Sequence, residues 1–330
     1  MANKKLKKST VLIVGGAGFI GVHTCMLLKN AGYSLVIFDN FTHGTTGYKR
    51  LAQLEQGNLA DSVRLGAVLR KTNPMAVIHC AASSEVGESM SNPAKYYANN
   101  VTSTFNLLNS MRDNGVNRLV FSSTCAVYGL PRHIPIVEDH PSFPVSPYGN
   151  TKLICELMVK DFSKAYGLNA VIFRYFNAAG ADPSGKLGNL INPRNNLITI
   201  ILETILGKRS SFVINGRDHH TPDGTCIRDY THVLDIAHAH KSALDYLSTN
   251  SGTAVINIGS GEGVSVIDLI KVIEKVTGRK VPLNFGTRRP SDPDQVVSDI
   301  SKAATTLRWH PQYSLEDIVS SSWKWYQSQT

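Results

Sequence analysis

The sequence predicts an α/β fold: a doubly wound parallel sheet, with a smaller domain formed by the C-terminal part of the chain. Short apolar runs alternate with longer segments of helical spacing up to about Phe176, and the first run leads into a glycine-rich turn that opens a helix. Beyond Phe176 the alternation gives way to long polar segments rich in glycine and proline, which indicates a second unit. Strands that alternate with helices pair in parallel and are covered by helices on both faces.

Five strands and three helices can be placed in the first part of the chain. Apolar runs predict buried strands at residues 10–14, 35–39, 76–79, 118–121 and 170–175. Helical spacing predicts helices at residues 19–30, 93–114 and 148–166. The order strand, glycine turn, helix and strand over residues 10–39 is a βαβ unit, so we expect a Rossmann-like sheet.

The second part of the chain is more irregular. Residues 177–194 have no clear period and predict a long loop, and residues 217–229 predict another polar loop. Helices are predicted at residues 195–208, 233–247, 264–277 and 314–327, and a strand at residues 255–258. We expect residues 1–176 to form the sheet domain, with the chain returning to it around residues 229–257. Residues 177–330 would form most of the smaller domain.

Composition and charge exclude several classes of protein. The chain has 330 residues, 42% hydrophobic and 18% charged, which suits one large or two smaller folded domains. No apolar run approaches the roughly 20 residues that cross a bilayer. Four of the basic residues behind the net charge of +9 lie near the N-terminus: Lys4, Lys5, Lys7 and Lys8. No basic stripe with interleaved aromatic residues follows, so we expect neither nucleic acid nor a membrane as a partner. A basic pocket for an anionic small molecule fits the charge equally well.

The cysteines and the N-terminus bear on location. The N-terminal lysines and the apolar run after them have the order of a signal peptide, but the run continues directly into the glycine turn at residues 15–21. The five cysteines are odd in number and scattered, without the spacing of metal ligands. We therefore expect a reducing, cytoplasmic environment and no bound metal.

The glycine turn predicts a dinucleotide site. Gly15, Gly18 and Gly21 follow a predicted strand and open a helix, where glycine lets the backbone approach a pyrophosphate and the helix N-terminus attracts it. Asp39 ends the second strand, close to where an acid binds ribose hydroxyls, and its charge would repel a 2′-phosphate. NAD is therefore favoured over NADP. The alternative is a structural turn followed by a chance acid.

Tyr148 and Lys152 predict an acid/base. Pro147 favours the first turn of a helix, and residues four apart on that helix share one face. A cation beside a phenol lowers the phenol's pKa from near 10 toward a value useful for taking a proton from an alcohol. Without support from the rest of the chain, such a pair would be two solvated helix residues.

A second glycine cluster, at residues 259–263, also follows a predicted strand and precedes a helix. No acid follows it at the distance expected of a dinucleotide site, so we interpret it as a structural turn.

These motifs occur together in a known family. Gly15-x-x-Gly18-x-x-Gly21, Asn99-Asn100-Val101, Phe121-Ser122-Ser123-Thr124, Tyr128-Gly129 and Tyr148-x-x-x-Lys152 resemble the extended short-chain dehydrogenase/reductase family. Four further blocks are similar to the UDP-glucose 4-epimerases within it: Val86-Gly87-Glu88-Ser89, Arg174-Tyr175-Phe176-Asn177, Pro222-Asp223-Gly224-Thr225-Cys226-Ile227-Arg228-Asp229-Tyr230 and Arg288-Arg289-Pro290-Ser291-Asp292. The resemblance covers nearly the whole chain.

The resemblance implies an NAD-dependent 4-epimerase of UDP-sugars, principally UDP-glucose and UDP-galactose. Tyr148 would remove the proton of the sugar 4-hydroxyl while hydride passes from C4 to NAD. Lys152 would lower the pKa of Tyr148 and hold the nicotinamide ribose, and Thr124 would hydrogen-bond O4. The 4-keto sugar would then turn over and receive the hydride on its other face.

The resemblance also implies the binding residues. For NAD they are Gly15, Gly18, Phe19, Ile20, Gly21, Asp39, Asn40, Asn58, Leu59, Ala81, Ala82, Asn99, Ser122, Tyr148, Lys152, Tyr175 and Phe176. For the UDP-sugar they are Thr124, Tyr148, Asn177, Asn196, Leu197, Asn215, Arg228, Arg289, Asp292 and Val296. Two guanidinium groups suit a diphosphate, and amide edges suit uracil and hydroxyls.

Three positions depart from the family pattern. Asn58 replaces an Asp that accepts from the adenine amino group, Ser84 replaces a Lys near the cofactor, and Asn215 replaces an aromatic residue that stacks on uracil. An Asn still accepts through its amide oxygen. Loss of the aromatic face would weaken nucleotide binding by about 1 kcal/mol or more.

Other substrates stay open, and other functions are disfavoured by particular residues. Val296 replaces a bulky Tyr of the family, which would admit an N-acetyl group and so UDP-GlcNAc and UDP-GalNAc; a UDP-pentose is a further alternative. A nucleotide-sugar 4,6-dehydratase needs an Asp-Glu pair after the active-site Thr, where this chain has Cys125 and Ala126. A protein that only senses NAD would show a damaged catalytic set, and the set is intact. The family also implies a homodimer, joined through helices 93–114 and 148–166.

Overall fold

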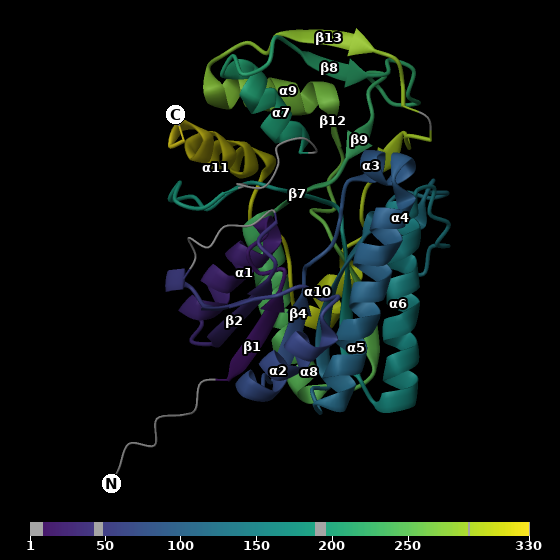
Figure 1. The fold of residues 1–330 in the computed structure, drawn as a ribbon. Helices are drawn as coiled ribbons and strands as arrows, with labels where there is room; N and C mark the ends of the chain where they lie inside the picture. The colour runs from purple at the N-terminus through teal and green to yellow at the C-terminus, as the bar shows by residue number, and fades with distance from the viewer. Residues whose placement is uncertain (1–8, 43–48, 189–195, 290, 330) are drawn as a thin grey trace.

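A parallel sheet of seven strands lies at the centre of the computed structural model, which describes residues 9–42, 49–188, 196–289 and 291–329 (Figure 1). Its strand order is β11-β6-β5-β4-β1-β2-β3. The strands are β1 (Thr10–Val14), β2 (Ser34–Asp39), β3 (Gln53–Gln56), β4 (Ala76–His79), β5 (Arg118–Thr124), β6 (Asn169–Tyr175) and β11 (Thr253–Ile258). The N-terminal lysines, residues 189–195 of the predicted loop and helix, and Pro290 lie outside the described residues.

Helices cover both faces of the sheet, as the sequence predicted. The helices α1 (Phe19–Asn30), α8 (Val233–Thr249) and α10 (Ser301–Leu307) pack on one face. The helices α2 (Ser62–Thr72), α5 (Ser103–Asp113) and α6 (Pro147–Tyr166) pack on the other. The strand order reverses between β1 and β4, and in such sheets ligands bind outside the carboxyl ends of the strands at this point.

The segment predicted as one helix over residues 93–114 is interrupted. After α3 (Val86–Ser91), the chain forms α4 (Pro93–Tyr96), a π-helical turn at Tyr97–Thr102, and then α5. A π turn holds an extra residue, and such turns occur frequently at functional sites. Tyr96 and Asn100 both lie on the buried side, as residues four apart on a helix can, while Asn99 is exposed.

The C-terminal part of the chain forms a second core above the sheet in Figure 1. It contains α7 (Leu197–Ile205), β8 (Phe212–Asn215), α9 (Val266–Thr277), β13 (Leu283–Gly286) and α11 (Leu315–Gln327). Short strands connect it to the sheet: β7 (Asn177–Ala179) pairs with β10 (Tyr230–His232), and β9 (Ile227–Arg228) pairs with both β12 (Val264–Ser265) and β14 (Gln295–Val296). None of the helices in the described part of the chain is long and apolar enough to cross a membrane.

The buried carboxylate of Asp229 joins three of these segments. It accepts five hydrogen bonds of 2.5–3.2 Å, from the backbone N–H and hydroxyl of Ser260, the N–H of Gly261, and the N–H and hydroxyl of Ser298. The glycine cluster at residues 259–263 therefore surrounds an anion that belongs to the chain itself. This agrees with its interpretation as a structural turn.

Local signals fix the start of α6, the helix that carries Tyr148 and Lys152. The Ser146 side chain accepts from Gly149 N as the N-cap, and Pro147 occupies the first helical position. One turn beyond Lys152, the fully buried Glu156 forms a bidentate ion pair with Arg174 of β6, with N···O distances of 3.0 and 2.7 Å. Ser123 of β5 also donates to Glu156. This pair fixes α6 against the sheet.

We predict that Arg174→Met lowers the free energy of unfolding by about 3–5 kcal/mol, because it leaves the Glu156 carboxylate buried without its partner. The double variant Arg174→Met/Glu156→Leu should lose less than the sum of the two single changes, measured by urea unfolding. Asp245→Asn, which breaks the exposed pair with Lys241, is the control and should cost about 0–1 kcal/mol. An Arg174→Met loss no larger than this control would contradict the prediction.

Candidate active site

The turn between β1 and α1 has no room for side chains. Gly15 has a φ of +75°, and a Cβ added there would lie 2.4 Å from the backbone nitrogen of Ala81. A Cβ at Gly21 would lie 2.5 Å from Gly15 O. Gly18 is the N-cap of α1. It has no side chain that could accept from the first backbone N–H groups of this helix, among them those of Phe19 and Ile20. The turn is therefore a backbone cradle at a helix N-terminus, the arrangement that binds phosphates.

The acid and amide groups after β2 and β3 are held by backbone N–H groups. The two oxygens of Asp39 accept from Ala17 N at 3.0 Å and from Phe41 N at 2.8 Å. Asn40 accepts from Thr42 N, and Asn58 accepts from Ala60 N at 2.9 Å, beside the buried Leu59. The amide oxygen of Asn58, expected to accept from adenine, thus already has one donor, and one lone pair remains.

The structure distinguishes between two neighbouring asparagines. Asn99, the predicted cofactor ligand, is exposed and donates to Ser83 Oγ at 3.2 Å. Asn100 is buried, exchanges two hydrogen bonds with the Ser83 backbone, and donates to Thr151 of α6. Asn100 therefore fixes the loop after Ala81 and Ala82 against α6, a role that the sequence analysis missed. Its spacing of four residues from the buried Tyr96 was the available signal.

The three predicted catalytic residues converge at the carboxyl end of β5. Thr124 ends this strand and accepts from Ala126 N at 3.2 Å, and Lys152 donates to the backbone oxygen of Ser122 at 2.7 Å. Tyr148 lies one turn before Lys152, and Tyr96 packs edge-on against its ring at 6.4 Å. All three of these side chains are buried.

Burial dominates the acid/base properties of this group. It raises the pKa of Tyr148 to about 12, although a hydrogen bond with Thr124 acts in the opposite direction. Burial also lowers the pKa of Lys152. The sequence-based expectation was that Lys152 would lower the pKa of Tyr148. In the protein without ligands the net shift of the Tyr148 pKa is upward because desolvation of the phenolate dominates, and the ammonium of Lys152 is directed at Ser122 O.

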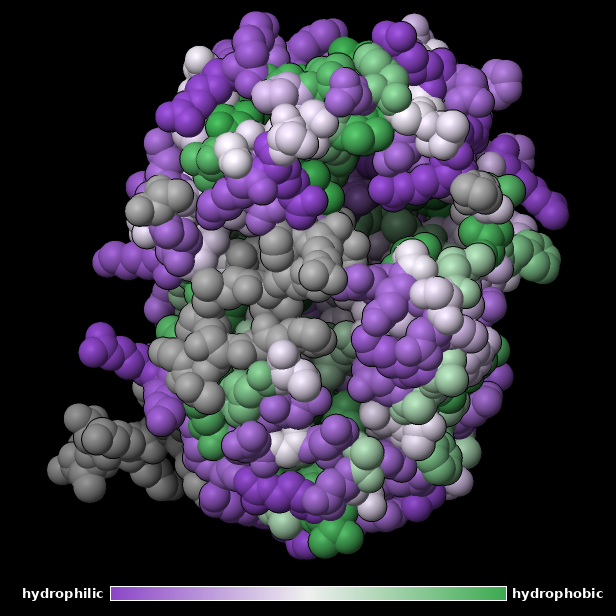
Figure 2. All heavy atoms as spheres, turned by 45° about the horizontal axis from the view of Figure 1, so that its top comes forward, coloured by the Kyte–Doolittle hydropathy of each residue, from purple (hydrophilic) through white to green (hydrophobic). Residues whose placement is uncertain are grey.

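A second set of predicted residues, those expected to bind the UDP-sugar, comes from the C-terminal part of the chain. Arg228 of β9 forms an ion pair with Asp292 at 2.5 Å, and Val296 of β14 packs in one cluster with Phe176 and Cys125, the residue after Thr124. Arg289 is exposed. The structure thus packs Val296 with Phe176, and it brings Arg228 close to Cys125, the residue after Thr124. Tyr175 ends β6, and its hydroxyl lies 3.2 Å from Ser122 Oγ. The space-filling view is hollowed between the upper and lower parts of the molecule (Figure 2).

The predicted uridine-side residues are engaged within the protein. Asn196 caps α7 through Ile198 N at 3.1 Å and donates to Ala178 O. Leu197 begins that helix, and Asn177 is exposed on β7. The backbone oxygen of Asn215 lies 3.4 Å from His219, whose other ring nitrogen contacts Asp294 at 3.1 Å. Sequence reasoning missed this His219–Asp294 contact, which joins the end of β8 to the segment that carries Asp292.

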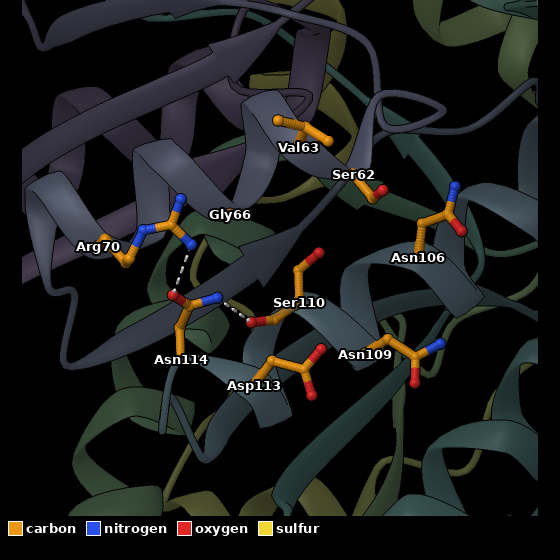
Figure 3. Close-up of a pocket in the computed structure, with 9 residues that line it drawn as sticks. All are labelled: Ser62, Val63, Gly66, Arg70, Asn106, Asn109, Ser110, Asp113 and Asn114. Carbon is orange, nitrogen blue, oxygen red and sulfur yellow. Dashed lines mark hydrogen bonds between the residues drawn. The ribbon is translucent and has the colours of Figure 1, made fainter.

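Two other features within the described residues lie apart from these functions. His219, Cys226 and Asp292 have ligand atoms within 4.8 Å of one another, as in a metal site, but the side chains of Asp292 and His219 are already paired with Arg228 and Asp294. A cavity of about 300 Å³ between α2 and α5 is lined by Ser62, Val63, Gly66, Arg70, Asn106, Asn109, Ser110, Asp113 and Asn114 (Figure 3). None of these nine is a predicted site residue.

Comparison with known proteins shows the family to which the chain belongs. The family model described as GDP-mannose 4,6 dehydratase matches residues 12–322. Together with the Tyr148/Lys152 site, this defines a nucleotide-sugar enzyme of the extended short-chain dehydrogenase/reductase class.

More similar proteins narrow the class. The UDP-glucose 4-epimerase of Rhizobium leguminosarum bv. trifolii is 44% identical over 96% of this chain and 97% of its own length. The crystal structure of the UDP-glucose 4-epimerase from Brucella ovis in complex with NAD has a TM-score of 0.93 and 43% identity, covering 96% and 97% of the two chains. The enzyme from Bifidobacterium longum in complex with NAD⁺ and UDP has a TM-score of 0.93 and 36% identity, covering 97% and 98%. The chain belongs to the UDP-glucose 4-epimerase family.

The raised pKa of Tyr148 gives a spectroscopic prediction. A phenol whose pKa lies near 12 stays protonated as the pH rises through 9, so nucleotide-free protein should show no phenolate absorbance from Tyr148 at pH 8–9. The measurement is the ultraviolet difference spectrum between the wild type and Tyr148→Phe. A phenolate band at pH 8 that disappears in the variant would show that the protein alone ionises Tyr148.

Proposed function

We propose that this protein is an NAD-dependent 4-epimerase that interconverts UDP-glucose and UDP-galactose. The observation that carries the proposal is the convergence of Thr124, Tyr148 and Lys152 at the sheet edge that also holds the Gly15–Ala81 cradle. Relatives similar over nearly the full length are UDP-glucose 4-epimerases.

The residues present fit NAD. The cradle that a Cβ at Gly15 would fill admits a pyrophosphate. At the end of β2, the carboxylate of Asp39 is held in place by the backbone N–H of Ala17. We assign the remaining cofactor contacts as the family resemblance implies, with Asn100 added as a residue that positions the Ser83 loop. When bound, NAD supplies a hydride acceptor that can also return the hydride.

The protein's own groups move the proton. Tyr148 accepts the proton of the sugar 4-hydroxyl and gives it back, and Thr124 holds the sugar oxygen within reach. With its pKa near 12, Tyr148 needs positive charge beside it to act as a base, and the buried Lys152 is the protein's contribution. Burial makes this charge effective because little water screens it.

The neighbours of Thr124 disfavour a dehydratase. Burial raises the pKa of the Cys125 thiol to about 12, and Ala126 has no titratable group, so neither can serve as the acid or base that elimination requires. The 4-keto sugar therefore has no further reaction to enter except reduction. Epimerisation is the reaction that remains.

Arg228 and Arg289 are our candidates for the diphosphate, and Val296 sets the space near the sugar. Arg228 is held ready by Asp292 and lies close to Cys125. Val296 is small and packs against Phe176, so we propose some tolerance for the N-acetylated sugars UDP-GlcNAc and UDP-GalNAc.

We predict that the purified protein interconverts UDP-glucose and UDP-galactose, followed by NMR of the anomeric protons, and converts UDP-GalNAc more slowly. Tyr148→Phe should retain NAD yet lose several orders of magnitude in rate, because it cannot carry the proton. Val296→Tyr is the matched change for the sugar pocket and should suppress the N-acetylated substrates selectively.

Three outcomes would contradict this assignment. Turnover of UDP-GalNAc alone would make the N-acetylated sugar the substrate, and a 4-keto-6-deoxy product would make the protein a dehydratase. Near-normal turnover by Tyr148→Phe would remove Tyr148 from the mechanism.

We further propose a cytoplasmic homodimer. All five cysteines are free, which fits a reducing environment. The helices α3, α5 and α6 and the π turn lie together at one side of the molecule and expose large apolar side chains, among them Met90, Tyr97, Phe105 and Leu157 (Figure 1). Phe105 and Leu157 are each about half exposed, on the two helices that the family resemblance implies for association. A second copy would cover them.

We predict a dimer in light scattering, and a monomer for Phe105→Glu/Leu157→Arg, because the changes place charges on the apolar contact. Val63→Glu on α2 is the control, since Val63 is 80% exposed and lies outside this face. A monomeric wild type, or a Phe105→Glu/Leu157→Arg protein that still forms dimers, would reject this interface.

A further inference from the structure

Two buried residues, four apart in the sequence, contact the turn of α6 that carries Tyr148. Asn100, in the π turn, donates to Thr151 at 3.1 Å. Tyr96 ends α4, and its ring packs edge-on against the ring of Tyr148, with 6.4 Å between the ring centroids and 79° between the ring planes. Aromatic pairs prefer such edge-to-face packing at centroid distances of about 4.5–7 Å. Tyr96 is thus in direct contact with the proposed acid/base.

The hydroxyl of Tyr96 is anchored at the start of α3. Its oxygen accepts from Glu85 N at 3.1 Å, and it lies 2.7 Å from Glu85 O and 2.8 Å from Glu88 Oε2. The other oxygen of Glu88 accepts from Lys95 at 2.6 Å. A phenol has one proton, and both of these oxygens are acceptors for it. The ring of Tyr96 is therefore held by its hydroxyl as well as by packing.

The side chain of Tyr148 is held at two places. Thr124 forms a hydrogen bond with its hydroxyl, and Tyr96 packs against its ring. The helix fixes the backbone of Tyr148, but a side chain on a fixed backbone can still turn between staggered rotamers. A buried and anchored neighbour that fills the space beside the ring restricts this turning. Tyr96 has no exposed surface, so it acts on the site through Tyr148 and not by contact with a ligand.

We propose that Tyr96 is a positioning residue for the reaction: its anchored ring holds the ring of Tyr148 so that the phenol oxygen stays within reach of the sugar 4-hydroxyl. This inference rests on the proposed function. Proton transfer needs hydrogen-bond contact between the two oxygens, and a displacement of about 1 Å at a reacting group costs on the order of a hundredfold in rate. Loss of the Tyr96 ring should therefore lower kcat, while the KM for the UDP-sugar and the amount of bound NAD stay unchanged.

The test follows interconversion of UDP-glucose and UDP-galactose by NMR, with the rate expressed per mole of bound NAD so that unfolded protein does not count. Tyr96→Leu removes the ring, and its kcat should fall by about ten- to a hundredfold at an unchanged KM. Tyr96→Phe removes the hydroxyl but keeps the ring that packs against Tyr148. It should restore most of the rate.

A double variant shows whether Tyr96 acts through Tyr148. Tyr148→Phe lacks the hydroxyl that carries the proton, so its residual rate does not depend on where that hydroxyl is held. Tyr96→Leu/Tyr148→Phe should therefore be no slower than Tyr148→Phe alone, because residues that act as a unit have non-additive effects. A general structural role of Tyr96 would instead lower both rates by the same factor.

Tyr326→Leu is the matched control, because it removes a buried tyrosine ring from the core of the C-terminal part of the chain. It should leave kcat unchanged even where it lowers stability. Three results would overturn the inference while the proposed function stands: a Tyr96→Leu kcat equal to that of the wild type, a Tyr96→Phe loss as large as that of Tyr96→Leu, or additive losses in the double variant. A wild type that interconverts no UDP-sugar would overturn the proposed function, and the inference with it.

Discussion

The carboxylate of Asp229 is the point on which the site depends. It lies between Arg228 and β10, and it accepts hydrogen bonds from the turn after β11 and from Ser298 beyond β14. The contact with the turn after β11 fixes Asp229 to the sheet. The contact with Ser298 fixes it to the segment that carries Asp292 and Val296. Since a buried carboxylate is tolerated only when its oxygens are hydrogen-bonded, the five donors are an obligatory set. Together with the pairing of β9 and β14, this group holds Arg228 and Val296 near Cys125, the residue after Thr124.

Much of the fold followed from local patterns. The strands at residues 10–14 and 76–79 and the helix at residues 19–30 were found with the predicted bounds, because buried apolar runs and the glycine turn that opens this helix are strong local signals. The two-stranded sheet of β8 and β13 was not predicted, since each strand has only four residues and exposes Val213, Leu283 and Phe285. The helix α2 was also missed; Gly66 at its centre and the exposed Val63 weaken its pattern.

The residues of the candidate site likewise divide into those that local patterns predict and those that depend on distant partners. The Tyr148/Lys152 pair and the glycine turn were evident because their spacing is local and tied to one helix or one turn. The choice between Asn99 and Asn100 was not evident, because the family resemblance pointed to Asn99 and the partners of Asn100, Ser83 and Thr151, are distant in the sequence. The role of Asp229 depends on partners 31 to 69 residues away, and no local pattern encodes it. The effect of Lys152 on the pKa of Tyr148 could not be judged from the sequence, because burial is the largest influence on the pKa of both groups.

The ion pair between Glu156 and Arg174 has a consequence for Lys152. Glu156 lies one turn along α6 from Lys152 and would be its natural partner, but its two oxygens bind Arg174. The direct contacts of the buried Lys152 ammonium are therefore a backbone oxygen and the ring face of Phe121, and Glu156 acts on it without a direct ion pair. Such a charge is unfavourable in the empty protein and favourable once an electron-rich ligand lies beside it. The empty site is thus the less stable state of the fold, and ligand binding and folding stability rise together.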